Sequence, residues 1–150
     1  QPGSCEDSAI MSPPLPLSTQ IDALRRLLRE ERDRLRPDCW SLAWEMTERT
    51  AQLLPSWEGL RADDAASCLD VEDVVGRYLP DALTAFLAIP DRQKPAAADE
   101  LLAQLTTLDH EHLRATRRLG RRLRSRLRAA GEVAALRFPQ HRATHQHPDD

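Results

Sequence analysis

Apolar residues recur every three or four positions along most of this 150-residue chain, a spacing that places them on one face of a helix. In the first such segment, charged residues separate four apolar ones: Ile21, Leu24, Leu28 and Leu35. Thr19, followed three residues later by Asp22, is typical of a capping box and predicts where this helix begins. Pro37 predicts its end, because proline cannot continue the backbone hydrogen bonds of a helix.

The middle of the chain carries two more helical patterns around one ambiguous stretch. Asp38 is positioned to cap a second helix, which a proline ends after position 54. Residues 56–70 show no clear period, and we expect a short turn there. Asp70 and Asp73 predict the start of a third helix. Pro80 is expected to kink or break that helix before it restarts.

The last helix carries the longest apolar pattern and is predicted to begin near Ala96. At ~100° per residue, its apolar side chains form one stripe about 140° wide: Leu101, Leu102, Leu105, Leu108, Leu113, Leu119, Leu123, Leu127 and Ala130. Other helices have to bury this stripe, because an isolated amphipathic helix owes most of its stability to packing. Val133 and Leu136 leave the stripe, so we expect the helix to bend or end near Gly131.

These segments predict an all-α protein, either a helical bundle or a coiled-coil-like hairpin of about four to five helices with a long C-terminal amphipathic helix. The heptad-like spacing of the first and last helices favours shallow packing angles. We expect a flexible N-terminal arm over residues 1–18, a single helical domain over 19–138 and a disordered, histidine-containing tail over 139–150.

The composition removes several function classes. Aromatic residues make up 4% of the chain, and 5 Gly against 11 Pro leave no glycine-rich phosphate loop. Cys5, Cys39 and Cys68 have no C-x-x-C spacing, which favours a reducing compartment, and the last two are expected in the core. The longest apolar run is far shorter than the ~20 residues of a membrane span, and no signal-peptide pattern opens the sequence. We therefore expect a cytoplasmic protein.

A basic run lies on the polar side of the last helix. Eight arginines fall within fifteen residues that contain no acid: Arg114, Arg117, Arg118, Arg121, Arg122, Arg124, Arg126 and Arg128. One interpretation is complementarity with acidic helices of this chain or of a second copy, because residues 37–109 carry fourteen acids against five bases, a net charge of −9. The alternative is a face that binds nucleic acid or an acidic membrane surface. No aromatic residue lies among the arginines to stack on a base.

No residue pattern points to catalysis or to a cofactor. His110 and His112 do not form the H-E-x-x-H zinc motif, because helical residues two apart diverge by ~200°. His112 falls on the leucine stripe, so we expect it to be buried and hydrogen-bonded. The tail, expected to be disordered, holds the remaining metal-ligand candidates: His141, His145 and His147. No nucleophile elbow or nucleotide-binding loop occurs, and we expect neither enzyme activity nor a cofactor.

Three segments resemble small, mostly uncharacterised helical proteins of high-GC bacteria. DVEDVVGRYLPDALTAFLAIP (Asp70–Pro90) resembles their Y-L-P-[DE]-x-L-x-[AL]-[YF]-L-x-[LI]-P segment, and ADELLAQLTTLD (Ala98–Asp109) and AAGEVAALRF (Ala129–Phe138) follow it. The Tyr-Leu-Pro core is also similar to that of the XpaC-like group, which is linked by name to toxic-anion resistance and indolyl-phosphate hydrolysis. The resemblance covers about half of the chain and implies a helical fold without catalytic residues. This chain departs from it in the basic block over 114–128, where those proteins are more acidic.

Three functional hypotheses follow. The first is a non-catalytic module for protein interaction or self-association through the leucine stripe: Leu101, Leu105, Leu108, Leu119, Leu123 and Leu127. The second is an anion-binding module for nucleic acid or an acidic membrane surface, with these candidates: Arg114, Arg117, Arg118, Arg121, Arg122, Arg124 and Arg128. The third, implied only by the XpaC-like resemblance, is a metal-handling or hydrolase-associated role.

Overall fold

The computed structural model describes residues 15–139, and over this range the chain is helical with no strand, which confirms the predicted all-α class. Short 3-10 or π turns join most of the helices, which run in this order: α2 (Leu17–Glu30), α3 (Pro37–Ala51), α4 (Trp57–Asp63), α5 (Ala65–Asp73), α6 (Leu79–Leu87) and α7 (Lys94–Arg137). At 44 residues, α7 is the predicted long C-terminal helix.

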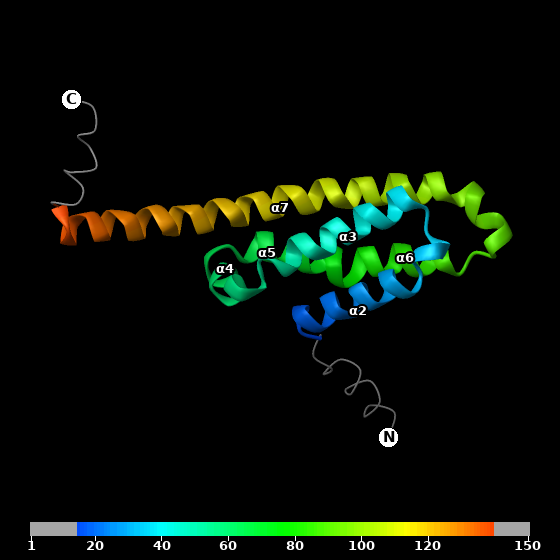
Figure 1. Ribbon diagram of the computed structural model, residues 1–150, viewed down its shortest axis with the longest axis horizontal. Coiled ribbons are helices and arrows are strands. Elements are labelled where there is room, and N and C mark those ends of the chain that lie inside the picture. Colours follow the sequence, from blue (N-terminus) through cyan, green and yellow to red (C-terminus); the bar gives the residue numbers. More distant parts are fainter. Residues whose placement is uncertain (1–14, 140–150) are drawn as a thin grey trace, which may run out of the picture.

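The other helices form a bundle along the N-terminal part of α7. In Figure 1, α7 runs the length of the molecule, α3 and α6 lie along it, and α2 lies on the far side of the bundle. The core between them is made of fully buried side chains such as Ile21 and Leu28 of α2, Met46 of α3, Leu83 of α6 and Leu105 of α7. The distal part of α7 extends past α4 and α5 and past every other helix in the part of the chain that the structure describes (Figure 1).

Packing, rather than the predicted capping box, sets the start of α2. The helix begins at Leu17, ahead of Thr19, and its N-cap residue makes no side-chain hydrogen bond. The predicted cap is wrong because Leu17 is buried against the core, so the N-cap position moves three residues earlier, from Thr19 to Pro16. α2 also ends early, at Glu30, and a 3-10 turn carries the chain to Leu35, which is buried in an extended conformation.

The predicted cap of the second helix is displaced in the same way. α3 begins at Pro37, so Asp38 lies in its first turn, where its carboxylate accepts the Cys39 N–H at 2.8 Å. α3 ends at Ala51, three residues before its predicted end, and a 3-10 turn over Leu54–Ser56 follows.

The ambiguous stretch contains two short helices. Asp64 is the true N-cap of α5, because its side chain accepts the Ser67 N–H at 3.2 Å. Asp70 and Asp73 lie near the end of α5, so the helix start predicted there is wrong. Trp57 of α4 is buried, as a packed segment requires.

Pro80 interrupts the helical hydrogen bonds without breaking the chain's helical course. A π turn over Val74–Tyr78 joins α5 to α6, and the Leu79 N–H donates to the Val74 carbonyl five residues earlier. The wider turn accommodates the proline ring, which has no N–H for a regular i→i+4 bond. Val75 and Leu79 remain fully buried across this turn, so the predicted kink or break takes the form of a π turn.

α7 passes straight through the position where we expected it to bend or end. The helix continues to Arg137, and a Cβ added at Gly131 would meet no atom within 4 Å. That expectation was wrong because the change in the apolar pattern after Ala130 reflects the loss of neighbouring helices, not a change in backbone conformation.

Candidate functional site

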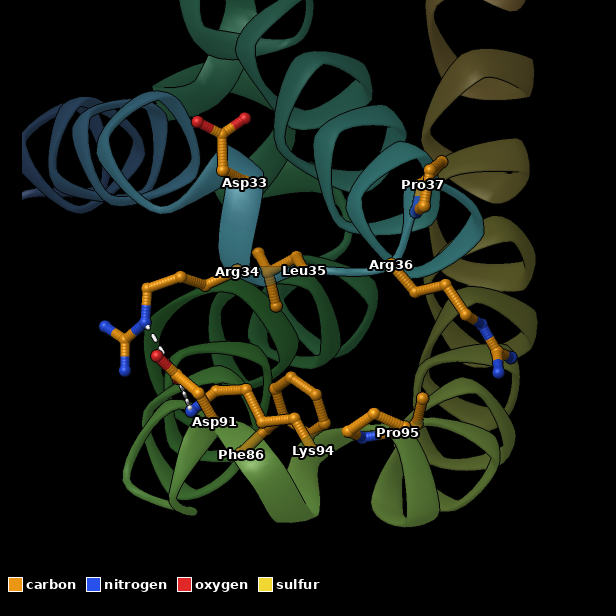
Figure 2. A pocket seen from close by; sticks show the side chains of 10 residues that line it. Asp33, Arg34, Leu35, Arg36, Pro37, Phe86, Asp91, Lys94 and Pro95 are labelled. Carbon is orange, nitrogen blue, oxygen red and sulfur yellow. Dashed lines mark hydrogen bonds and ion pairs between the residues drawn. The ribbon is translucent and has the colours of Figure 1, made fainter.

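A hollow of about 510 Å³ opens where the turn after α2 meets the start of α7 (Figure 2). Phe86 contributes to its apolar floor, and Arg34, Asp91 and Lys94 line its rim. The Lys94 ammonium donates to the Leu87 carbonyl at 3.2 Å and to Asp91 at 2.8 Å. Arg34 donates to the same Leu87 carbonyl at 3.0 Å.

The cations around this hollow serve the fold. Arg36, the third one, donates to Asp38 and to Asp99, both at 2.9 Å. Each of the three cations is therefore hydrogen-bonded to oxygens of the protein. Lys94 donates to carbonyls at the end of α6 that have no partner within that helix. The arrangement ties α3 and α6 to the start of α7.

His112 lies fully buried between α3 and α7 in a closed hydrogen-bond network. Its Nδ1 is 3.0 Å from the Arg49 guanidinium, and its Nε2 is 2.6 Å from the Thr50 hydroxyl. Because a guanidinium only donates, Nδ1 accepts, and Nε2 carries the proton that is donated to Thr50. The Thr50 hydroxyl donates in turn to the Met46 carbonyl at 2.9 Å, and Asp109 balances the Arg49 charge at 3.0 Å.

The environment keeps His112 neutral. Burial, followed by the charge of Arg49, lowers the pKa of His112 to about 3. The prediction that His112 is buried and hydrogen-bonded is confirmed. Cys39 and Cys68 are buried, as predicted, and burial raises the pKa of each thiol to about 11, so both are poor nucleophiles at neutral pH.

The predicted leucine stripe is buried over only part of its length. Leu101, Leu105 and Leu119 are buried inside the chain, so a partner could reach them only by displacing the other helices. Leu108 and Leu123 are half-buried at the edge of the core. Leu127 is 72% exposed, so the prediction that the whole stripe is covered is wrong for its distal end within one chain.

The distal end of α7 forms what we call the free arm, residues 127–138. Its large apolar side chains are exposed: Leu127, Val133 at 68%, Leu136 at 81% and Phe138 at 59%. The last ion pair between α7 and the bundle is made just before it, by Arg126 of α7 and Asp63 of α4. At ~1.5 Å per residue, the helical part of the arm extends roughly 16 Å.

Most of the predicted basic face has no acidic partner. Arg126 pairs with Asp63, and Arg114 pairs with Glu111 of its own helix at 3.6 Å. Within residues 15–139, no carboxylate lies within ion-pairing distance of the remaining six: Arg117, Arg118, Arg121, Arg122, Arg124 and Arg128. Pairing inside the described part of the chain therefore accounts for only two of the eight arginines.

A stack of two tryptophans joins α2 to α3, which the sequence analysis did not predict. The Trp40 and Trp44 rings are 5.2 Å apart and nearly parallel, at 9°. Arg32 lies 4.0 Å from the Trp40 ring centre and Arg29 lies 5.4 Å from that of Trp44. The Trp40 indole N–H donates to the Leu28 carbonyl at 2.7 Å. The spacing of four between the tryptophans is the available sequence signal.

The described residues contain no cluster of three or more His, Cys, Asp or Glu side chains arranged to hold a metal ion. The metal-ligand candidates His141, His145 and His147 lie outside the described residues. Among the helices between residues 15 and 139, none has both the length and the apolar character that crossing a membrane requires.

Comparisons with known proteins do not assign this chain to a family. No family model, no curated protein and no solved structure matches the chain. The resemblance to the XpaC-like group therefore stays a prediction.

Proposed function

We propose that this protein is a non-catalytic helical module that self-associates through the free arm of α7. The observation that carries the proposal is the exposure of the arm's large apolar side chains, Leu127 foremost, on a stretch of helix that extends past the other helices of the described residues. A helix of this length has little stability of its own in water, so it gains most from packing against another surface.

A second copy of the chain supplies a matching apolar surface. At ~100° per residue, Leu127, Ala130 and Ala134 continue the seam that Leu105 and Leu119 form inside the bundle. Two arms packed side by side in opposite directions cover these side chains mutually, and such a two-fold arrangement closes without further copies.

Charge also favours a second copy. Arg128 and Arg137 of the arm make no ion pair within the described part of the chain. On the bundle, nine carboxylates of the described residues also lack an ion-pair partner: Glu30, Asp33, Glu45, Glu58, Asp64, Asp70, Asp73, Asp81 and Glu100. An arm that reaches the bundle of a second copy brings these opposite charges together, and this electrostatic part of the attraction weakens with salt.

The two free, buried thiols indicate the compartment in which the module works. Cys39 and Cys68 are buried as thiols, and we place the module in the cytoplasm, where thiols stay reduced. Catalysis has no part in the proposal, because His112 is neutral and fully hydrogen-bonded and the buried thiols are held protonated.

Light scattering coupled to size exclusion tests the proposal. Between about 10 and 300 μM, wild-type mass should rise from the 17.0 kDa of one chain toward twice that value. The variant Leu127→Ser should stay at one chain: a two-fold dimer buries Leu127 of both copies, and because burying one leucine contributes ~1.5–3 kcal/mol, losing both costs at least about 100-fold in affinity.

The matched control is Leu69→Ser, which removes an equally large exposed leucine from α5 (56% exposed) and should leave self-association unchanged. Circular dichroism checks that every variant remains helical. A wild-type protein that keeps the mass of one chain at all these concentrations, or a control that dissociates like the arm variant, contradicts the proposal.

A further inference from the structure

A second surface of α7, ahead of the free arm, forms a groove with the C-terminal end of α3. The groove has a volume of about 470 Å³ and contains no carboxylate among its lining residues: Arg49, Gln52, Leu53, Leu113, Thr116, Arg117, Gly120, Arg121 and Arg124. It lies where α3 ends beside α7. Arg49 of α3 and the two residues just after its end, Gln52 and Leu53, form one wall, and side chains of α7, three arginines among them, form the other.

Three arginines of α7 follow the groove at helical spacing. Arg117, Arg121 and Arg124 are four and three residues apart, which places their attachment points ~6 Å and ~4.5 Å apart along the helix axis. Gly120 lies between them in the groove, and the space where a side chain would start is open, because an added Cβ would meet no atom within 4 Å.

The charge of these three side chains is not balanced. No carboxylate among the described residues lies within ion-pairing distance of Arg117, Arg121 or Arg124. Arg49 adds no net charge, because Asp109 pairs with it at 3.0 Å, but its guanidinium is fixed in position by this pair and by His112. Within residues 15–139, the groove therefore has three positive charges without an ion-pair partner, beside the guanidinium of Arg49 that is fixed in position.

The opposite side of Arg121 is less favourable for an anion. A hollow of about 340 Å³ lies there, lined by Arg118, Arg122 and Ser125, but also by Asp64. The hydrogen bonds from Ser67 lower the pKa of Asp64, so this carboxylate is ionised at neutral pH and repels an anion. The groove on the α3 side is thus the stronger candidate, and Arg121 borders both.

We propose that the α3–α7 groove binds an anion of two or more linked phosphate groups, held by Arg117, Arg121 and Arg124. Planar guanidinium groups bind phosphate oxygens in pairs, and successive arginines along one helix face match successive phosphates of one chain. No aromatic side chain lines the groove to stack on a nucleobase, and its concave shape does not suit a flat membrane surface.

Calorimetric titration with inorganic tripolyphosphate at low salt tests this site on the full-length protein. We expect one equivalent to bind per chain and the affinity to fall as salt is added, because bound counterions are released from the ligand. Arg121→Gln should weaken binding about tenfold, and Arg117→Gln/Arg124→Gln about 100-fold, at ~1.4 kcal/mol per tenfold step.

The matched control is Arg26→Gln, which removes an exposed arginine from α2, far along the sequence from the groove. This variant should bind tripolyphosphate like the wild type. An equal loss of affinity in Arg26→Gln and Arg121→Gln overturns the proposal, because it means that net charge alone attracts the ligand.

Two substitutions of Gly120 separate binding from folding. Gly120→Ala places a methyl group in open space and should retain binding within about twofold, since alanine also favours the helix. Gly120→Glu should keep the fold but lower the affinity at least tenfold, because it sets a carboxylate among the three guanidinium groups. Unchanged tripolyphosphate binding by Gly120→Glu overturns the placement of the site.

Other anions supply the final comparison. A single-stranded oligonucleotide and vesicles that contain phosphatidylserine are titrated under the same conditions, with single phosphate as a further probe. We expect tripolyphosphate to bind more tightly than single phosphate and the vesicles not to bind. Binding of oligonucleotide or vesicles without binding of tripolyphosphate overturns the proposal in favour of another ligand class.

Discussion

At the scale of single residues, the network around His112 decides how the inside of the bundle responds to pH. Each nitrogen of the ring has one partner, and the two partners require different roles: Arg49 donates to Nδ1, and Thr50 accepts from Nε2. Protonation makes both nitrogens donors, which sets Nδ1–H against the Arg49 guanidinium. The folded protein therefore resists the proton, whereas the unfolded chain accepts it at an ordinary pKa near 6.5.

This difference predicts that acid destabilises the fold before the carboxylates titrate. The folded pKa of about 3 lies below the unfolded value, so stability is fully present above pH 6.5 and falls at lower pH. The free energy of unfolding should fall by ~1.4 kcal/mol per pH unit, or about 2 kcal/mol between pH 7.5 and 5. Urea unfolding at both pH values measures it.

The control for this prediction is His112→Gln, which can hydrogen-bond but does not titrate. It should be less stable than the wild type at pH 7.5 by ~1–3 kcal/mol, because one buried partner loses its bond. Its stability should be nearly constant between pH 7.5 and 5. A wild-type protein as stable at pH 5 as at pH 7.5 contradicts the neutral, closed network.

At the scale of helices, the sequence predicts faces better than boundaries. The period of Leu101, Leu105 and Leu119 correctly identifies the buried side of α7, because side-chain direction follows from helix geometry alone. The start of α2 at Leu17 and the N-cap of α5 at Asp64 depend on what the rest of the bundle covers, and local signals at Thr19 and Asp70 mispredicted both.

The course of α7 through Gly131 yields a prediction about the arm. Gly131 has open space where a side chain would start, so Gly131→Ala should stabilise the arm helix by ~1 kcal/mol, roughly fivefold in amide protection. Hydrogen exchange over residues 127–137 measures this. Gly131→Pro, the opposing variant, should remove protection there. A loss of protection in Gly131→Ala contradicts a helix that continues to Arg137.

At the scale of the whole molecule, the two ends of the bundle differ in character. At the end near Lys94, ion pairs and hydrogen bonds to carbonyls connect the helices. At the other end, α7 extends past the bundle (Figure 1). The sequence shows the leucine and arginine patterns of α7, but not the point where the bundle stops covering them. Leu127 and Leu119 have the same local pattern, and only the fold exposes one and buries the other.

The same limit applies to the candidate sites. The arginine run was visible in the sequence, yet the groove needs the end of α3 beside Arg121, and the Trp40–Trp44 surface needs Arg29 from α2. Both depend on contacts between segments far apart in the chain, which helical periodicity does not encode.

The central claim is that the free arm is a helix which becomes covered when a second copy binds. Amide exchange of residues 127–137, measured in dilute and in concentrated protein, tests it most directly. Protection of the arm should rise at least tenfold at the higher concentration, because a partner removes the fraying of an uncovered helix. Protection of the amides around Leu105, inside the bundle, should not change. Arm protection that is the same at both concentrations contradicts the account.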